Sequence, residues 1–373
     1  MKKWIVIIYL IIALFFSSSI TVNAEENSNI QYDFSAVYES LSDEARQSLE
    51  NIGAESVDVQ KLSQISFDSV VGEISNIAAQ NAEMPLKGLI TIIALLLLCS
   101  ILSAYRNTLS SDVSTAINIV SALCITCAVA MPAISVIDSA ASVIEISSNL
   151  MLSYIPIITV IMASSGQAVS SGAYYASMIA AGEGVGQISS KIVVPFLNMF
   201  LGLSITSNIS PDINLGGFTN IIAKIIKWLL GFAMTIFTSI LAVKQLITGS
   251  LDNVSGRAVR FALTSFVPIV GPALSDAYRT VQGSVSMLKS GMGVFVIIAI
   301  AVVFMPVIIQ SFMWVITLWV GKSTAEVLNL SQTAKLLQSV STVFTTLIAI
   351  LLCIMSIYII SSAVVLLVGG GDS

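Results

Sequence analysis

The residues around position 270 combine charged side chains with helix-breaking positions inside an apolar stretch. The members of this group, at 261–275 and just beyond, are Pro268, Gly271, Pro272, Asp276, Arg279 and Lys289. An apolar segment interrupted by proline and glycine is typical of a re-entrant or broken helix, and such helices line substrate paths in transporters. Asp276 and Arg279 are three positions apart, so they can pair on one helix face. The pattern indicates a pore or gate element, and a solvated loop closed by a surface ion pair is the alternative.

Three further acidic residues, Asp138, Glu145 and Glu183, lie within or beside apolar segments. A charged side chain in lipid is costly, so each of them is a candidate intramembrane polar residue. Glu183 stands among glycines in Gly182-Glu-Gly-Val-Gly186. These small residues predict close helix packing, with Glu183 lining a polar cavity or reaching an interface.

The residue types that most often carry catalysis are missing or isolated. Histidine is absent, which removes the commonest general base and metal ligand. The cysteines, Cys99, Cys124, Cys127 and Cys353, lie in apolar stretches, where they are expected to pack as small hydrophobic side chains. We therefore expect a protein that is not an enzyme and has no catalytic residue, no cofactor and no metal site.

The amino-acid composition indicates which class of protein carries these residues. Of the 373 residues, 56% are hydrophobic and only 10% are charged, against about 25% charged in a typical soluble domain. So few charges cannot cover a soluble core of this size, and an acidic pI without a basic patch argues against nucleic-acid binding. The sequence predicts an all-α polytopic integral membrane protein.

The N-terminus has the pattern of a secretory signal. Lys2 and Lys3 precede an apolar run at 4–16, and Ala24 ends a small-residue cleavage motif. Residues 1–24 are therefore predicted to be a signal peptide, with an uncleaved anchor helix as the alternative.

The next segment, 25–84, is expected to lie outside the cytoplasm as a small acidic helical unit. Residues 25–83 carry twelve acidic side chains and two basic ones. Within this segment, Ser42 predicts the start of a helix and Gly53 its end.

Residues 85–373 form the predicted multispanning membrane domain. Apolar segments that could cross a bilayer lie at 88–105, 115–137, 150–164, 192–210, 225–243, 292–319 and 341–367. Two less regular segments, 170–190 and 261–275, are expected to be re-entrant or broken helices, beside about seven transmembrane helices. With this count, Lys289 lies on the cytoplasmic side and Lys322 on the opposite side. Residues 322–340 are predicted to form one amphipathic helix.

The stretch from Phe266 through Val294 resembles the signature region of the stage III sporulation protein AE family. The resemblance is carried by its Pro-Ile-Val-Gly-Pro break, the Ser-Asp pair that follows and the later Lys-Ser-Gly. The order of a signal-like start, an acidic segment and a multispanning body is also similar, and the acidic segment matches in character alone.

The resemblance implies a multipass protein of the mother-cell membrane that surrounds the forespore in an endospore-forming bacterium. It implies a subunit of a channel complex, similar to a feeding tube for secretion or transport, that late forespore development requires. The implied partners are the lipid bilayer, an ATPase, ring-forming and small multipass stage III sporulation proteins and, indirectly, a forespore membrane protein. No catalytic residues are implied.

Two other functions stay open at this point. One is a membrane scaffold that assembles the complex without a conduit of its own, through segments 25–84 and 322–340. The other is an independent permease-like secondary transporter. The transporter is suggested by a faint internal repeat between 132–163 and 268–299, because repeated halves are common in transporters.

Overall fold

The computed structural model describes residues 35–54, 59–104, 111–188, 194–209 and 271–367, and scattered helical positions between 221 and 239. The chain divides into two compact units, Met1–Tyr32 and Asp33–Ser373, and every described residue lies in the second unit. The predicted signal peptide with Ala24, as well as Pro268, lies outside the described residues.

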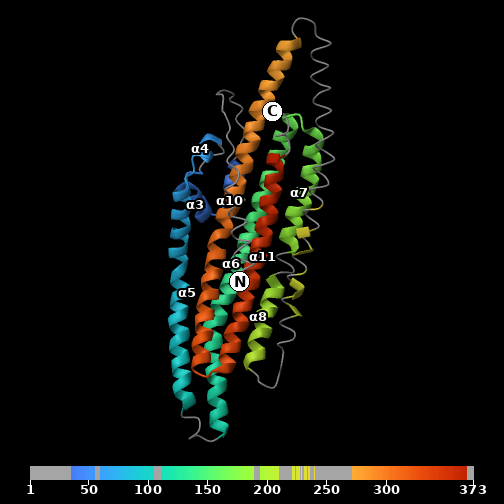
Figure 1. Cartoon of the computed structure of the whole chain (residues 1–373). Coiled ribbons are helices and arrows are strands. Elements are labelled where there is room, and N and C mark those ends of the chain that lie inside the picture. The colour runs from blue at the N-terminus through green and yellow to red at the C-terminus, as the bar shows by residue number, and fades with distance from the viewer. Residues whose placement is uncertain are drawn as a thin grey trace. The chain divides into compact units, whose positions relative to one another are not determined.

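Helices make up all the regular secondary structure of the described residues, which confirms the all-α prediction (Figure 1). In chain order they are α2 (Ser35–Glu39), α3 (Asp43–Asn51), α4 (Val59–Ser63), α5 (Phe67–Ala104), α6 (Ser111–Ser164), α7 (Ala168–Ile188), α8 (Val194–Ile209), α10 (Gly271–Val327) and α11 (Ser331–Leu367).

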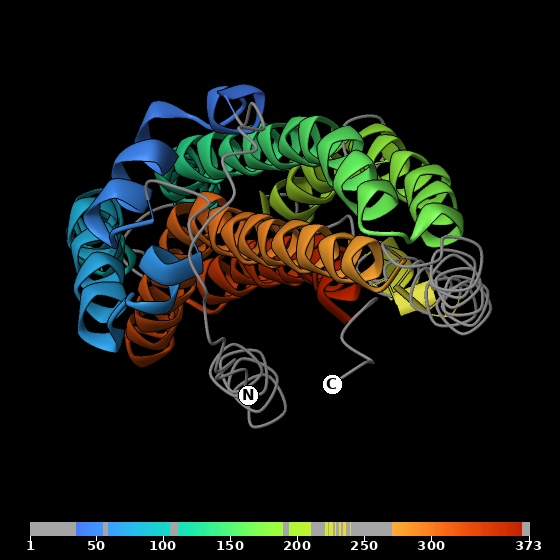
Figure 2. The ribbon, with the colours of Figure 1, turned by 90° about the horizontal axis from the view of Figure 1, so that it is seen from above.

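Helix α10 is the centre of the second unit. It contacts the other three long helices, α5, α6 and α11, as well as the short helices α3 and α4. Seen from above, α10 lies between α6 and α11 (Figure 2). Helix α7 packs on α6, and α8 contacts both α6 and α11.

Helices α10 and α11 form an antiparallel hairpin with a fixed register. Gly293 faces Leu366, because a Cβ atom at Gly293 would approach Leu366 Cδ2 to 2.6 Å. Further along the hairpin, Trp314 stacks on Phe344 with their ring centroids 6.1 Å apart. The paired numbers rise on one helix as they fall on the other, so the two helices stay in contact along most of α11.

The described residues hold four helices that are long and apolar enough to cross a membrane: Asp68–Ser103, Val120–Ser164, Gly283–Val327 and Ser331–Leu366. The predicted count of seven spans is therefore not confirmed. Two of the predicted spans, 115–137 and 150–164, lie in the single uninterrupted helix α6. The residues between these two spans include no glycine or proline that could end the helix. At 54 residues, α6 rises about 80 Å, far more than a bilayer core of about 30 Å.

Large apolar side chains are exposed on the part of the α5–α6 hairpin nearest its connection. They are Leu86, Ile90, Leu97, Leu98, Ile101 and Leu102 on α5, and Val120, Leu123, Met131 and Ile134 on α6. Cys124 and Cys127 lie exposed on the same part of α6, so their predicted burial in a packed core is wrong, whereas Cys99 is buried. Many exposed large apolar side chains on one part of a hairpin are typical of contact with lipid.

Helix α5 joins the acidic segment to the membrane domain without a break. It continues through Pro85, although a proline removes one helical hydrogen bond. At this point α10 supports α5, because the buried Thr317 hydroxyl donates to the Pro85 carbonyl oxygen at 3.2 Å. The predicted boundary between residues 84 and 85 therefore falls inside one helix.

The direction of α10 differs from the one that seven crossings predict. Helices α5 and α10 run in the same direction, since Gly88 lies against Trp314 and Ile92 against Gly321 (Figure 1). Helix α10 therefore begins at the end where α3 and α4 contact it, and Lys289 lies toward that end. Lys322 lies toward the opposite end, so the order of the two lysines is the reverse of the prediction.

Three helices end in the same hydrogen-bonded turn, the Schellman motif. Gly53 ends α3 with φ 80°, Gly166 ends α6 with φ 84°, and Asn329 ends α10 with φ 58°. In the last of these turns, the Asn329 amide donates to Glu326 and the Leu330 amide donates to Ala325. The start of α3 at Ser42 and its end at Gly53 were expected from the sequence and are confirmed. The Ser42 hydroxyl accepts a hydrogen bond from the Ala45 amide as an N-cap. The single helix predicted over 322–340 is wrong, because the Asn329 turn divides it between α10 and α11.

The segment predicted as irregular at 170–190 forms the regular helix α7 over most of its length. Its glycines were expected to allow close helix packing. At Gly172 and Gly184, however, no atom lies within 4 Å of an added Cβ atom, so close packing does not require glycine at either position.

Thiol labelling tests the direction of α10. In a variant that lacks the native cysteines, Glu50→Cys, Gly283→Cys and Gln338→Cys each place one thiol at an exposed position. We expect a membrane-impermeant thiol reagent to label Glu50→Cys and Gly283→Cys from one side of the membrane, and Gln338→Cys from the other. Labelling of Gly283→Cys and Gln338→Cys from the same side would contradict the helix directions described here.

A second experiment tests the contact between α5 and α10. A side chain at Gly88 would overlap the Trp314 ring, whereas nothing lies within 4 Å of a Cβ atom at Gly72 on the same helix. We expect Gly88→Leu to lower the free energy of unfolding by about 1–3 kcal/mol through overpacking. Gly72→Leu should cost nothing, as measured by denaturation of both variants in the same detergent. Equal losses in the two variants would show that this contact contributes no stability.

Candidate functional site

The break predicted around position 270 coincides with the start of a helix. Gly271 is the first residue of α10 and Pro272 the second, a position where proline fits because its missing amide hydrogen is not needed there. Asp276 and Arg279 follow in the first turns of α10, and their side chains are outside the part of the chain that the structure describes. Their pairing, and a pore or gate role for this group, stay predictions.

The other acidic candidates are separate from this group. Asp138 and Glu145 are exposed on α6, two turns apart on one face of the helix. Glu183 lies on α7, where the structure describes the backbone alone. The structure does not bring the acidic candidates with described side chains into one site.

Lys289 is a buried charged residue in the first third of α10. Its side chain is 1% exposed on α10, and its Nζ atom donates a hydrogen bond to Gln167 Oε1 at 3.4 Å. Gln167 belongs to the turn between α6 and α7, directly after Gly166. This bond therefore connects α10 to the beginning of α7. A lysine buried inside a helix that is apolar enough to cross a membrane is a functional candidate, because removing its charge from water is costly.

Two turns along α7 from Gln167, a group of polar side chains is buried between helices. We call this group the polar seam, and it consists of Tyr154 on α6, Tyr174 on α7, and Tyr358, Ser361 and Ser362 on α11. The Tyr174 hydroxyl donates to the Ser361 carbonyl oxygen at 3.3 Å. The Ser361 hydroxyl in turn contacts the sulfur atom of Met178 on α7. The polar seam therefore connects α7 to α11.

The remaining members of the polar seam continue it along α11. Tyr358 lies three positions before Ser361 and four before Ser362, so its side chain neighbours both, while Ser361 and Ser362 themselves point in different directions. Ser362 is 0% exposed, and its hydroxyl has no hydrogen-bond partner among the described residues. Buried polar groups of this kind either join helices or line a path for polar solutes.

Sequence reasoning identified Lys289 but missed the polar seam. Serines in apolar helices were expected to bond to their own backbone, and Ser147 does so through the Val143 carbonyl at 2.7 Å. The sequence feature that could have predicted the polar seam is the presence of Tyr154, Tyr174 and Tyr358 in otherwise apolar helices. A buried tyrosine hydroxyl usually needs a hydrogen-bond partner.

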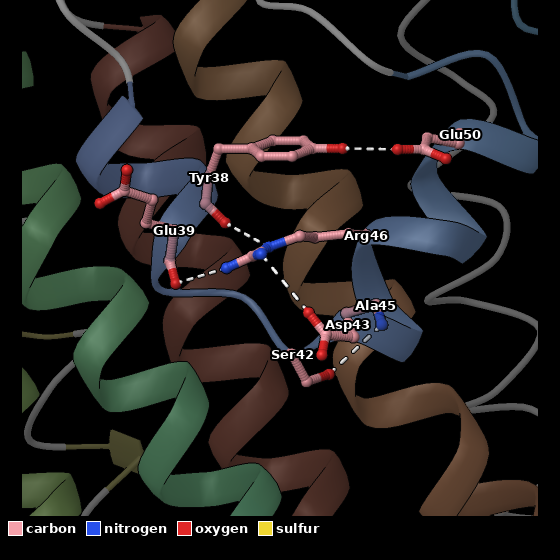
Figure 3. Close-up of polar contacts among 7 residues, drawn as sticks. All are labelled: Tyr38, Glu39, Ser42, Asp43, Ala45, Arg46 and Glu50. Atoms are coloured by element: carbon pink, nitrogen blue, oxygen red, sulfur yellow. Dashed lines mark hydrogen bonds and ion pairs between the residues drawn. The ribbon is translucent and has the colours of Figure 1, made fainter.

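A second polar cluster organises the corner between α2 and α3, where Arg46 is the central residue (Figure 3). Its Nε atom donates to the Tyr38 carbonyl at 3.0 Å, and its Nη2 atom donates to the Glu39 carbonyl at 2.7 Å. Its Nη1 atom lies 3.4 Å from Asp43 Oδ1. The last carbonyl groups of a helix lack intrahelical donors, so Arg46 satisfies two of them at the end of α2.

The same corner is braced on both sides of Arg46. The guanidinium group lies 5.7 Å from the centre of the Tyr38 ring, and the Tyr38 hydroxyl donates to Glu50 Oε1 at 3.2 Å (Figure 3). Beyond the corner, Asn51 donates to Glu73 on α5 at 3.0 Å. All these groups are engaged with one another, so the corner has a structural role.

No group of three or more potential metal ligands comes together among the residues that were described. The cysteines are free thiols. The expectation that the protein has no cofactor and no catalytic centre stays a prediction.

Comparisons with known proteins agree on one family. The family model for stage III sporulation protein AE matches residues 55–369, which include all four candidate membrane spans and leave out the Arg46 corner. The Bacillus subtilis (strain 168) protein named stage III sporulation protein AE is 27% identical over 173 residues, or 46% of this chain. The aligned part amounts to 43% of that relative's length. No solved structure matches the chain.

Replacing Arg46 tests the role of the corner. We expect Arg46→Ala to destabilise the packing of residues 35–54 by about 1–3 kcal/mol, because two helix-end carbonyls lose a charged donor. Limited proteolysis of the full chain in detergent should then cut this region faster. The control is Lys61→Ala, which removes an exposed cation from the neighbouring α4 and should leave proteolysis unchanged. Equal rates for Arg46→Ala and the parent protein would show that the corner does not depend on Arg46.

Proposed function

Since the chain belongs to the stage III sporulation protein AE family, we propose that it is a multipass membrane subunit of a channel complex that late forespore development requires. In this proposal the complex carries material by secretion or transport, in the manner of a feeding tube. The subunit resides in the mother-cell membrane around the forespore and has no enzymatic activity of its own.

The proposal depends on two findings taken together: the family to which the chain belongs and the polar side chains buried inside its apolar helices. The family match covers the helices that are long enough to cross a membrane. Within the same region, the polar seam and Lys289 place hydroxyl groups and a cation inside an apolar body. A polar interior in a lipid-facing protein supports a role in moving polar solutes.

The proposed partners follow from the same family assignment. They are a stage III ATPase, ring-forming subunits and small multipass subunits, with an indirect contact to a forespore membrane protein. The acidic segment with its Arg46 corner is the proposed contact on the far side of the membrane, because Asp43, Glu44 and Glu50 are exposed there. Its negative charge favours partners with basic surfaces.

A membrane scaffold is the second candidate function. It is favoured by the closed state of the polar seam, whose side chains are all buried. A scaffold needs a rigid body and exposed contact surfaces, and it needs no water-filled path through its helices.

An independent permease-like transporter is the third candidate function. The segments of the faint repeat, as far as they are described, lie on α6 and α10, which contact each other through long apolar stretches. Solute uptake by the protein alone in liposomes would support this function over that of a complex subunit.

Substitutions at the start of α10 test the proposal in sporulating cells. We expect Asp276→Ala, Arg279→Ala and Gly271→Leu to stop late forespore gene expression while the protein level in the membrane stays unchanged. The readout is a late forespore reporter together with an immunoblot of membranes. Thr280→Ala changes an exposed neighbour on the same turn and serves as the matched control. Normal spores from all three variants would argue against a pore or gate at this position.

A further inference from the structure

We propose that the α10–α11 hairpin ends inside the membrane, where its exposed polar end lines a water-filled vestibule that attracts small anions. We call this end, residues 322–338, the hairpin tip. The inference goes beyond the proposed function and does not depend on it, because it concerns how the chain alone meets lipid and water.

The first argument is the height of the hairpin tip relative to α5. Helices α5 and α10 run in the same direction, and Gly321 on α10 lies against Ile92 on α5. Glu326 and Leu97 each lie five residues further along, so they are at about the same height. The Glu326 side chain is 57% exposed, and Leu97 is 49% exposed. A charged and an apolar side chain are therefore both exposed at one level of the molecule.

Helix α11 shows the same contrast with α5. Leu337 on α11 also lies against Gly321, at 3.4 Å from an added Cβ atom. Gln338, the next residue, is exposed. Ile90 on α5 lies at about this height, less than one turn from Ile92, and is 69% exposed. One side of the molecule is thus polar where the other side is apolar.

The second argument places this level inside the lipid layer. On α5, the exposed charged residues end with the ion pair of Glu83 and Lys87, and a series of exposed large apolar side chains begins at Met84. On α6, the exposed Ile134 is followed by the exposed Asp138. A bilayer core of about 30 Å corresponds to about 20 helical residues. Measured from Met84, such a core extends to the end of α5 and includes the level of the hairpin tip, near the connection of α5 to α6 (Figure 1).

The third argument is the exposed face of α10. Phe312, Ile316 and Trp319 are exposed along one face of this helix, and Glu326 continues that face two turns later. Tryptophan favours the boundary between lipid and water, and a lysine next to it, here Lys322, can extend into water. The exposed face of α10 therefore changes from lipid to water at Trp319, which lies well inside the bilayer core rather than at its edge.

The fourth argument is the turn between α10 and α11. Asn329 is exposed with φ 58°, and Leu330 has no side-chain oxygen that could accept from the first amides of α11. At membrane depth, such a backbone is tolerated only where it is buried in protein or lines a water-filled cavity. Because this turn is exposed, water must reach it. The vestibule therefore opens on the membrane surface nearest the turn, opposite the end where α3 contacts α10.

The charge of the hairpin tip determines which solutes enter. Its charged residues are Lys322, Glu326 and Lys335. Lys322 Nζ lies 3.6 Å from Glu326 Oε1, whereas Lys335 is exposed and makes no ion pair with any described residue. The neighbouring segments 88–104 of α5 and 113–137 of α6 contain no charged residue. A net positive charge beside low-dielectric walls attracts anions.

Thiol labelling tests the vestibule. In a cysteine-free full-length chain, Gln338→Cys and Ile90→Cys place one thiol each at the same height, on the hairpin tip and on α5. Freezing and thawing opens the membranes, so that a water-soluble maleimide reaches both surfaces. We expect Gln338→Cys to react many-fold faster than Ile90→Cys, and the two to react equally after denaturation. Equal rates in intact membranes, or an unreactive Gln338→Cys, would overturn the proposal.

Charged reagents test the preference for anions. With Gln338→Cys, an anionic thiosulfonate should react several-fold faster than a cationic one, and adding Lys335→Gln should abolish the difference. The control is Lys87→Gln, which removes an exposed lysine at the opposite edge of the lipid-facing segment and should leave the difference unchanged. A preference for the cationic reagent, or one that persists in Lys335→Gln, would contradict the positive charge of the vestibule.

The same labelling distinguishes water from a partner protein. We expect Gln338→Cys to react both in liposomes of the purified chain and in membranes of sporulating cells. A reaction confined to the liposomes would show that another subunit covers the hairpin tip and that the vestibule is wrong. Since labelling does not require forespore development, the proposed function can fail while the vestibule stands.

Discussion

The antiparallel contact between α10 and α11 is the constraint from which the other helix positions follow. Gly293 permits Leu366 to approach, and Trp314 stacks on Phe344, so the two helices cannot slide along each other without losing both contacts. In lipid, helices gain little from hydrophobic burial against one another, and close packing supplies much of the association energy. A hairpin whose register is fixed by shape is therefore a suitable foundation for the weaker contacts around it.

Helix α5 and the α6–α7 pair are attached to this foundation in different ways. Trp314 stacks on Phe344 on one side and lies against Gly88 on the other, so a single side chain connects α5, α10 and α11. The α6–α7 turn meets α10 through the hydrogen bond from Lys289 to Gln167. Helix α6 also packs along α10 and α11, so the bond from Lys289 adds a polar contact to an attachment that packing already makes.

Local chemistry could be predicted from the sequence, and long-range pairing could not. Ser42 and Gly53 were identified correctly because a helix cap depends on a few neighbouring residues. Asn329 makes the same kind of turn as Gly53, yet the apolar pattern over 322–340 continued across it and hid the turn. Lys289 could be identified from the sequence because it is a charged residue next to an apolar segment. Its contact with Gln167 joins positions 122 residues apart, and no pattern in one sequence predicts such a pairing.

The length of α6 has a consequence for whatever this protein contacts. A helix that rises about 80 Å leaves roughly half of its extent beyond a bilayer core of about 30 Å, even when it is tilted. Asp138 and Glu145 give its middle part an exposed polar edge that water can solvate. Because α10 packs alongside α6, the part of α6 outside the bilayer core is held in a fixed direction. A partner that contacted this part would meet the protein at a set distance from the lipid.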